Sequence, residues 1–181
     1  MPYCNSIPKE LTPTKTYLGL GSNVGDRHCN LERALQLLSH KIKLALVSPI
    51  YDTAPVGNTR QKRFLNLVCQ ASTTLKPTDL LFFIKEIEAG MGRQPGPLNS
   101  PRPIDIDILF YGDRIVNTPE LIVPHPRLTE RAFVLVPLND IASDFVHPAT
   151  GERITQLLQA LNIEPDDVVR LENIRGELCT K

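Results

Sequence analysis

Hydrophobic and polar residues alternate most regularly in the middle of the chain, from 104 to 109. Isoleucines at positions 104, 106 and 108 alternate with Asp105 and Asp107, and a period of two places each set on its own face of a β-strand. We therefore predict a half-buried strand whose isoleucines face a core. The two aspartates then share the opposite face, where a solvated polar surface is the ordinary outcome of such alternation.

Earlier in the chain, apolar runs of strand length predict strands at 16–20, 42–51 and 64–73. Apolar residues recur at helical spacing between 31 and 38, which predicts an amphipathic helix. Asp26 precedes this stripe and is placed to cap the first turn of the helix.

A second helix is predicted before the aspartate strand, because leucine and isoleucine recur at helical spacing from 80 to 87. Thr78 or Asp79 is the expected cap of its first turn. A connector rich in proline and glycine follows at 94–103. Its length and its place beside the aspartates indicate a lid.

Beyond the aspartate strand, Gly112 and Asp113 predict a turn. The residues at 114–116 are then expected to form a hairpin partner of that strand. A mostly apolar run at 131–138 fits either a strand or a helix, with a helix favoured, and a late helix is predicted at 154–161.

The order of elements up to Tyr111 is strand, helix, strand, strand, helix, strand, which is the split βαβ arrangement of ferredoxin-like folds. The predicted fold class is therefore α+β: a ferredoxin-like βαββαβ core with an antiparallel sheet and helices packed on one face, followed by a C-terminal hairpin and helices. We expect a flexible N-terminal tail at 1–14, a single domain at 15–162 and a C-terminal tail at 163–181.

Composition narrows the possible functions. Twenty basic residues balance twenty acidic ones, so no overall field favours nucleic acid or an anionic membrane, and we expect neither as a partner. The four cysteines lack Cys-x-x-Cys spacing, which argues against zinc and against a disulfide framework. With no apolar signal core near the N-terminus, a reducing cytoplasm is the predicted location.

The candidate chemistry centres on the aspartate strand. Aspartate is a poor strand former, and two neighbouring carboxylates raise each other's ionisation cost, so a cation between Asp105 and Asp107 would resolve the conflict. Paired hard oxygen ligands suit Mg²⁺, which substrate phosphates usually complete. The glycine-rich turn near Gly21 is neither standard phosphate loop, because Val24 replaces a required glycine and no Lys-Ser/Thr pair follows.

Six motifs, in order, resemble the hydroxymethyldihydropterin pyrophosphokinase family, and the resemblance covers about 16–161. They are Gly21-Ser22-Asn23, Thr53-Ala54-Pro55-Val56-Gly57, Phe64-Leu65-Asn66, Ile87-Glu88 with Gly92-Arg93, Arg102 with Asp105 and Asp107, and Val123-Pro124-His125 with Arg131-Ala132-Phe133. The resemblance implies an ATP-dependent diphosphokinase of folate biosynthesis. Such an enzyme transfers the pyrophosphoryl group of ATP to 6-hydroxymethyl-7,8-dihydropterin and releases AMP. The family also suggests a monomer.

The resemblance assigns roles residue by residue. Two Mg²⁺ ions would be held by Asp105 and Asp107, which with Arg93 and Arg102 form the expected catalytic group. The expected ATP-binding residues are Lys85, Glu88, Arg93, Arg102, Ile108, His125 and Arg131. The expected pterin-binding residues are Thr53, Val56, Phe64, Asn66, Asp105 and Phe133. The arginines and His125 would supply positive charge along the triphosphate.

Two other classes of function remain open from the residues alone. One is another Mg²⁺-dependent transferase that uses an activated phosphate donor at an Asp-x-Asp site. The other is a non-catalytic ferredoxin-like ligand-binding module, which would not require the arginines and His125 to converge on the aspartate face. Formation of AMP, ADP or no product would distinguish the three.

Overall fold

The computed structural model describes residues 12–55, 61–94, 96 and 100–171. Its centre is a six-stranded antiparallel sheet in which β5, β1, β4, β3 and β8 are neighbours in that order, while β2 also pairs with β4. The strands are β1 (Thr14–Ser22), β2 (Lys43–Val47), β3 (Tyr51–Thr53), β4 (Phe64–Thr73), β5 (Asp105–Tyr111) and β8 (Val168–Arg170).

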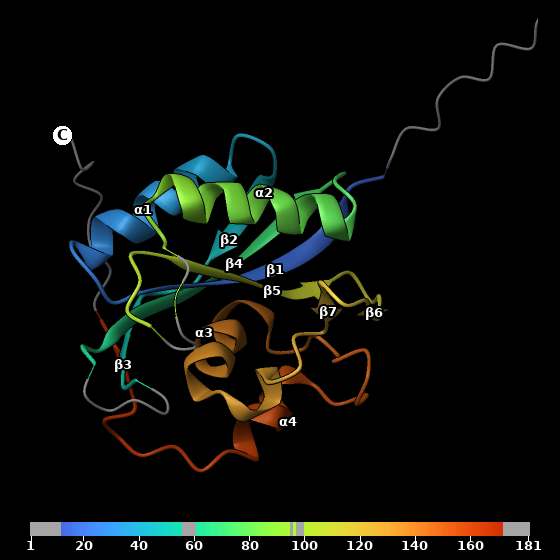
Figure 1. Ribbon diagram of the computed structural model, residues 1–181. Coiled ribbons are helices and arrows are strands. Elements are labelled where there is room, and N and C mark those ends of the chain that lie inside the picture. The colour runs from blue at the N-terminus through green and yellow to red at the C-terminus, as the bar shows by residue number, and fades with distance from the viewer. Residues whose placement is uncertain (1–11, 56–60, 95, 97–99, 172–181) are drawn as a thin grey trace, which may run out of the picture.

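Helices cover both faces of the sheet (Figure 1). On one face lie α1 (Arg27–Leu38) and α2 (Pro77–Gly90), which bury leucines and isoleucines of β1, β4 and β5. On the other lie α3 (Ala132–Ala142) and α4 (Ile154–Gln159), which close a second cluster over Tyr17, Val68 and Phe110. The second face is therefore shared between this smaller core and any functional site.

The aspartate strand has the predicted orientation. Ile106 and Ile108 on β5 are buried in the core beneath α1 and α2, whereas Asp105 and Asp107 keep part of their surface exposed on the other face. The hydrophobic effect thus fixes the direction of the two carboxylates, because a one-residue change of register would bury both of them.

Helix starts were predicted with mixed success. The side chain of Asp26 accepts a hydrogen bond from the backbone N–H of Cys29, which confirms the predicted cap of α1. The expected caps of α2, Thr78 and Asp79, are wrong, because the helix begins at Pro77 and no side chain caps it. Proline suits the first turn of a helix, where its missing N–H would have no intrahelical partner.

The single strand predicted at 42–51 is divided into β2 and β3. Pro49 cannot donate a ladder hydrogen bond, and the chain leaves the strand path at Ser48. The Ser48 hydroxyl accepts a hydrogen bond from the backbone N–H of Val68, at 3.0 Å, and so replaces the missing ladder contact to β4.

The predicted pairing of 114–116 with the aspartate strand is wrong. Instead β6 (Val116–Asn117) pairs with β7 (Ile122–Val123) in a separate two-stranded sheet. Thr118 closes this hairpin, because its hydroxyl accepts a hydrogen bond from the backbone N–H of Leu121 at 3.1 Å.

The apolar run at 131–138, which fitted either a strand or a helix, follows a 3₁₀ turn at Leu128–Glu130 and forms α3. The favoured helix is therefore confirmed.

The segment predicted as a C-terminal tail contains β8, which pairs with the outer edge of β3. The sequence signalled no strand there, because Val168–Arg170 is short and lies within a polar stretch.

Within the lid connector at 94–103, residue 95 and residues 97–99 lie outside the described residues, so the lid stays a prediction.

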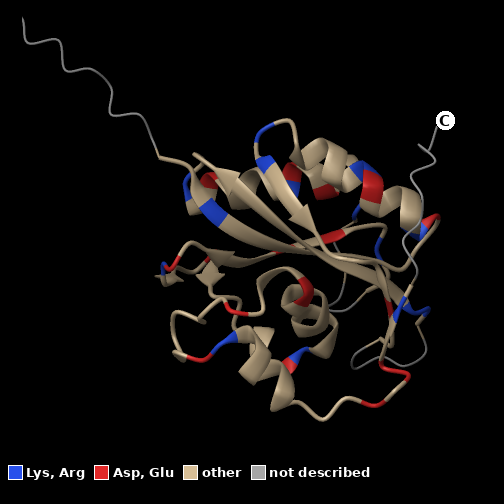
Figure 2. Cartoon of the chain, turned by 180° about the vertical axis from the view of Figure 1, so that it is seen from behind, with Lys and Arg blue, Asp and Glu red and all other residues tan. Residues whose placement is uncertain are grey.

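The charged residues and the cysteines were also the subject of sequence predictions. Acidic and basic residues are interspersed over the helices and loops (Figure 2), as the balanced composition predicted. Cys69 is buried and free. The cytoplasmic location stays a prediction. Of the helices within the described ranges, none has the length and apolar character that a membrane crossing requires.

Candidate functional site

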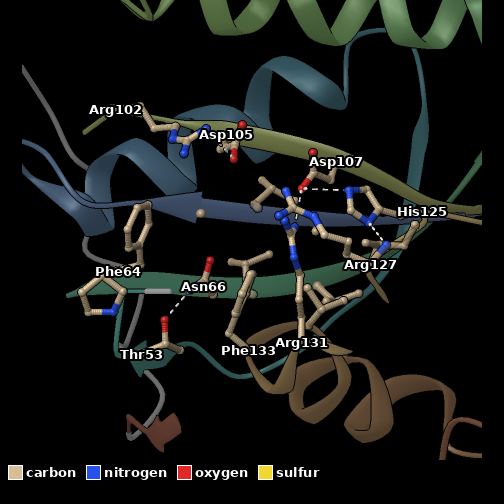
Figure 3. Close-up of a pocket in the computed structure, with 18 of the residues that line it drawn as sticks. Thr53, Phe64, Asn66, Arg102, Asp105, Asp107, His125, Arg127, Arg131 and Phe133 are labelled. Carbon is tan, nitrogen blue, oxygen red and sulfur yellow. Dashed lines mark hydrogen bonds and ion pairs between the residues drawn. The ribbon is translucent and has the colours of Figure 1, made fainter. Parts of the chain in front are cut away.

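A pocket of about 380 Å³ opens on the second face of the sheet, between the start of α3 and strands β1, β4 and β5. Figure 3 shows its two sides: Asp105 and Asp107 project from β5, and Phe64 and Asn66 lie across from them on β4. The pocket therefore lies on the face that the alternating pattern assigned to the two aspartates.

The floor of the pocket is β1, where two glycines replace side chains. In the strand register Gly21 lies opposite both Asp105 and Asn66, and Gly19 lies opposite Asp107. Cross-strand partners point to the same side, so these residues share one face. A Cβ at Gly21 would lie 2.5 Å from Oδ1 of Asn66, a distance that no alanine could occupy without displacing that amide.

Asp105 is held by two arginines from the connector after α2. Its carboxylate accepts a hydrogen bond from Arg93 and forms an ion pair with Arg102 at 3.1 Å. Asn23, in the turn after β1, accepts from the backbone N–H of Arg102 at 2.8 Å and so fixes where this arginine enters the pocket. Among the described residues, the buried Nε of Arg102 has no hydrogen-bond partner, which leaves a donor for a ligand.

Glu88 supports this arrangement from below. Its buried carboxylate accepts from Arg93, from Lys85 at 2.8 Å, and from the backbone N–H of Ile106 at 2.8 Å. Because one carboxylate joins α2, the connector and β5, Arg93 is fixed in position. Lys85 lines the pocket, whereas Glu88 lies behind it.

Asp107 is the less satisfied of the two aspartates. Burial and the neighbouring Asp105 carboxylate raise its pKa to about 6, although Arg131 and Lys85 oppose the shift. The Arg131 guanidinium lies 3.8 Å from its carboxylate and Nε2 of the His125 ring lies 4.0 Å from it, both too distant for a direct hydrogen bond. A divalent cation would relieve the repulsion between the two carboxylates.

His125 is neutral in the ligand-free pocket. Burial and the charges of Arg131 and Arg127 lower its pKa to about 4. Its Nδ1 accepts from the backbone N–H of Arg127 at 3.3 Å, which places the proton of the neutral ring on Nε2, toward Asp107. In this state His125 offers a neutral Nε2 donor, and its expected contact with the triphosphate stays a prediction.

Sequence reasoning missed Arg127, which also lines the pocket. Figure 3 shows its side chain beside that of Arg131. Burial and the charge of Arg127 lower the pKa of Arg131, although Asp107 and Asp105 oppose the shift. Its position two residues after His125 was the available signal, since proline-fixed segments hold both side chains at one place.

The charged half of the pocket is defined by its cations and its two carboxylates. Its residues are Lys85, Arg93, Arg102, Asp105, Asp107, His125, Arg127 and Arg131. Cations outnumber carboxylates in this half, so it favours a ligand with several negative charges. Arginine supplies several donors in a rigid plane, which suits phosphate oxygens.

The neutral half is defined by Thr53, Phe64, Asn66 and Phe133. Asn66 is buried and donates to the hydroxyl of Thr53 at 2.6 Å, which leaves its amide oxygen directed toward Gly21. Phe133 lies at the start of α3 and contacts Arg131, whose guanidinium is 5.4 Å from the ring centroid. Two aromatic side chains and a fixed amide suit a flat ring with polar edges.

The remaining predicted residues do not line the pocket within the described part of the chain. Ile108 is buried in the core under α2, so only its backbone could reach a ligand. Val56 lies outside the described residues, although its neighbours Ala54 and Pro55 line the pocket. Gln61, on the far side of the same loop, also lines the pocket and was not predicted.

The carboxylates fit Mg²⁺ better than a metal that needs a full set of protein ligands. In the described part of the chain, no three histidine, cysteine or acidic side chains gather around one point. Asp105 and Asp107 are two oxygen donors on one face, and Mg²⁺ is usually completed by water and phosphate oxygens. The donor set therefore fits a metal that arrives with a phosphate ligand.

Comparisons with known proteins agree with this arrangement. A family model described as 7,8-dihydro-6-hydroxymethylpterin-pyrophosphokinase matches residues 17–143. The chain is 42% identical over 149 residues to the 2-amino-4-hydroxy-6-hydroxymethyldihydropteridine pyrophosphokinase of Aquifex aeolicus, covering 82% of this chain and 93% of that protein.

Longer relatives also match. A folic acid synthesis protein of Dictyostelium discoideum is 46% identical over 132 residues, covering 73% of this chain and 20% of that protein. One from Pneumocystis carinii is 42% identical over 158 residues, with 87% and 21% covered. This chain thus spans about a fifth of these relatives.

A solved structure of an HPPK-DHPS protein in complex with substrates has a similar fold. The two superpose with a TM-score of 0.68 at 19% sequence identity, and the match covers 88% of this chain and 49% of that one. At this level of identity, the likeness shows the fold alone.

Proposed function

Because the chain belongs to the 7,8-dihydro-6-hydroxymethylpterin-pyrophosphokinase family, we propose that it transfers the pyrophosphoryl group of ATP to 6-hydroxymethyl-7,8-dihydropterin in folate biosynthesis. The products are AMP and the pterin diphosphate. The observation that carries the proposal is the row formed by Asp105, Gly21 and Asn66. In this row a carboxylate and an amide share one face of the sheet, and only Gly21, which has no side chain, lies between them.

The charged half binds the triphosphate. Arg93 and Arg102 already lie against Asp105, and the free Nε of Arg102 is available to a phosphate oxygen. Arg131 and the newly identified Arg127 approach from the α3 side, and neutral His125 donates from Nε2. Glu88 acts through Arg93, which it holds in place. The backbone around Ile108 remains the proposed contact for the base of ATP.

The neutral half binds the pterin ring. Phe64 and Phe133 provide apolar surfaces for the ring, and the fixed amide of Asn66 meets its polar edge. Thr53 orients that amide, and the loop that contains Val56 is proposed to complete the edge. Pterin bound in this way has its hydroxymethyl group directed across β1, over Gly21, toward Asp105.

The reaction joins the two halves. The hydroxymethyl oxygen releases its proton to solvent and attacks the β-phosphorus of ATP, the bond from that phosphorus to the α-phosphate oxygen breaks, and AMP leaves. Asp105 and Asp107 would hold two Mg²⁺ ions, which supply neutralisation of phosphate charge and lower the ionisation cost of the attacking hydroxyl. The chain itself contributes alignment of the two substrates and fixed arginine donors around the transferred group.

The order of strands in the sheet bears on the fold class. When β2 and β3 count as one strand, the sheet order β5, β1, β4, β2 supports a ferredoxin-like βαββαβ core. A single catalytic domain at 15–162 that acts as a monomer remains the expectation from the sequence.

Product analysis tests the function. The protein is incubated with ATP, Mg²⁺ and hydroxymethyldihydropterin, and the nucleotides are separated by chromatography. We expect AMP to form only when pterin is present. ADP would indicate an ordinary kinase, and intact ATP would indicate a module that binds ligands without turnover.

A further inference from the structure

Arg63 lies immediately before β4, outside the pocket, and joins two segments that are far apart in the chain. Its Nη2 donates to the carbonyl oxygens of Asp52, at 3.0 Å, and Asp166, at 2.9 Å. Its Nε donates to the carboxylate of Asp52 at 3.1 Å. In turn, the carbonyl oxygen of Arg63 accepts from Arg27 at 2.8 Å, which ties the group to α1.

The Asp166 end of this bridge belongs to the segment that forms β8. There the backbone N–H of Ala54 donates to the carbonyl oxygen of Asp167, and that of Leu171 donates to Ile50, both at 2.9 Å. The family model ends at residue 143, so this edge of the sheet is built from chain beyond the match. β3 is thus held by β4 on one side and by this segment on the other.

The contacts of Arg63 bear directly on the neutral half. Thr53, at the end of β3, orients Asn66, and Phe64 follows Arg63 in the chain. Arg63 directly precedes β4, and its guanidinium contacts Asp52 of β3, so one side chain joins these two strands beside Thr53 and Phe64. No contact of Arg63 in the described part of the chain reaches the charged half.

We propose that Arg63 is a positioning residue for the neutral half of the pocket, and that it acts by fixing β3 to the C-terminal segment at 164–170. This inference rests on the proposed function, because it assigns the pterin ring to the neutral half. Loss of the bridge allows β3 to shift, which misplaces Thr53 and the amide that Thr53 orients. The binding of pterin then weakens while the binding of ATP does not.

The first test is Arg63→Met, which keeps the apolar stem and removes the donors. We expect the Kd and KM for hydroxymethyldihydropterin to rise about tenfold, since small displacements of positioning groups have effects of this size. The Kd of a non-hydrolysable ATP analogue, measured by calorimetry, should stay within about twofold. Arg63→Lys should recover only part of the loss, because an ammonium group lacks the planar fork.

Arg33→Met is the matched control, because Arg33 is exposed on α1 and away from the bridge. We expect this variant to behave as the wild type in both titrations.

A second variant, Val169→Pro, tests the same bridge from the other end. Val169 pairs with Asp52, and the flanking bonds at Ala54 and Leu171 show that its N–H faces β3. Proline cannot donate there, so pterin binding should weaken with Arg63 intact.

Equal loss of pterin and ATP affinity in the Arg63 and Val169 variants would overturn the proposal, and so would pterin affinity equal to that of Arg33→Met. If the wild type itself neither binds pterin nor forms AMP, the proposed function fails. An active wild type with unaffected variants rejects only the role of Arg63.

Discussion

The two halves of the pocket are built on different principles. In the charged half, cations outnumber carboxylates, Asp107 has a raised pKa, and the Nε of Arg102 lacks a partner among the described residues. In the neutral half, the polar group that matters most is satisfied within the protein, since Asn66 is bonded to Thr53. One half is therefore incomplete without its ligand, while the other is already formed.

The difference indicates what each half contributes to the reaction. The charged half has more positive than negative groups, so it stabilises its ligand most when negative charge develops on the phosphates during the reaction. Substitutions there should therefore affect the transition state. A preformed neutral half selects a ring by shape and hydrogen-bond pattern, so substitutions there should affect ground-state binding.

The largest effect is expected from Asp105→Ala and Asp107→Ala. Each should lower turnover by about a thousandfold or more and weaken Mg²⁺-dependent nucleotide binding, because the metal loses a ligand. The fold should persist in both, since the isoleucine face of β5 is unchanged. Asp107→Ala should also raise the stability of the ligand-free protein, whereas Asp105→Ala should not, because it removes the ion pairs of this carboxylate with Arg93 and Arg102.

Steady-state kinetics and urea unfolding measure these effects, and Asp113→Ala in the turn after β5 is the control. Near-normal activity of either pocket variant at saturating Mg²⁺ would contradict the metal assignment.

Arg102→Ala is expected to have the next largest effect. Its turnover should fall by about a hundredfold or more, while the Kd of the ATP analogue rises far less, the pattern of a contact made mainly in the transition state. Single-turnover kinetics beside an analogue titration separate the two quantities. An equal change in both would place Arg102 in ground-state binding only.

In the neutral half, Phe133→Ala should weaken pterin binding by about 1–3 kcal/mol, the size of a lost stacking surface. Asn66→Leu should weaken it more, because polar groups on the ring edge lose their partner. The cation–π contact with Arg131 means that Phe133→Ala also has a small effect on ATP, whereas Asn66→Leu has none. Paired titrations of pterin and ATP analogue check this, and equal losses of both ligands would indicate a collapsed core.

The smallest effect concerns pH and the ligand-free protein. The pKa of Asp107 is raised from 3.8 to about 6, so the folded state holds a proton that the unfolded chain loses, and stability falls as pH rises through that range. The pKa of His125 is lowered from 6.5 to about 4, so stability falls as pH drops through that range. The two contributions oppose each other between about pH 4 and 6.

Asp107→Asn should therefore lose stability on acidification more steeply than the wild type, and His125→Asn less steeply. Urea midpoints at several pH values measure the difference. Parallel curves for all three proteins would contradict the two pKa shifts.

Local sequence patterns predicted the parts of the fold that depend on burial. The face of the aspartates, the Asp26 cap and the two long helices follow from periodicity and capping, which act within a few residues. The addition of β8 to β3 depends on which distant backbone groups remain unpaired, and no local pattern contains that information. The hairpin of β6 and β7 is local, but each of its strands has two residues, which is too short to give a periodic pattern.

The same limit applies to the site. The motifs identified Arg93, Arg102, Asp105, Asp107 and Asn66, which the structure brings to one pocket. The charge state of His125 could not be predicted, because it is set by burial and by Arg127 and Arg131, residues whose proximity only the fold establishes.

The measurement that tests the central claim most directly follows the β-phosphorus of ATP. The protein is incubated with Mg²⁺, hydroxymethyldihydropterin and ATP that carries an isotopic label on that phosphorus. The two-half arrangement predicts that all of the label moves to the pterin product and that AMP is unlabelled. Label that remains in ADP, or in unreacted ATP after prolonged incubation, would contradict pyrophosphoryl transfer.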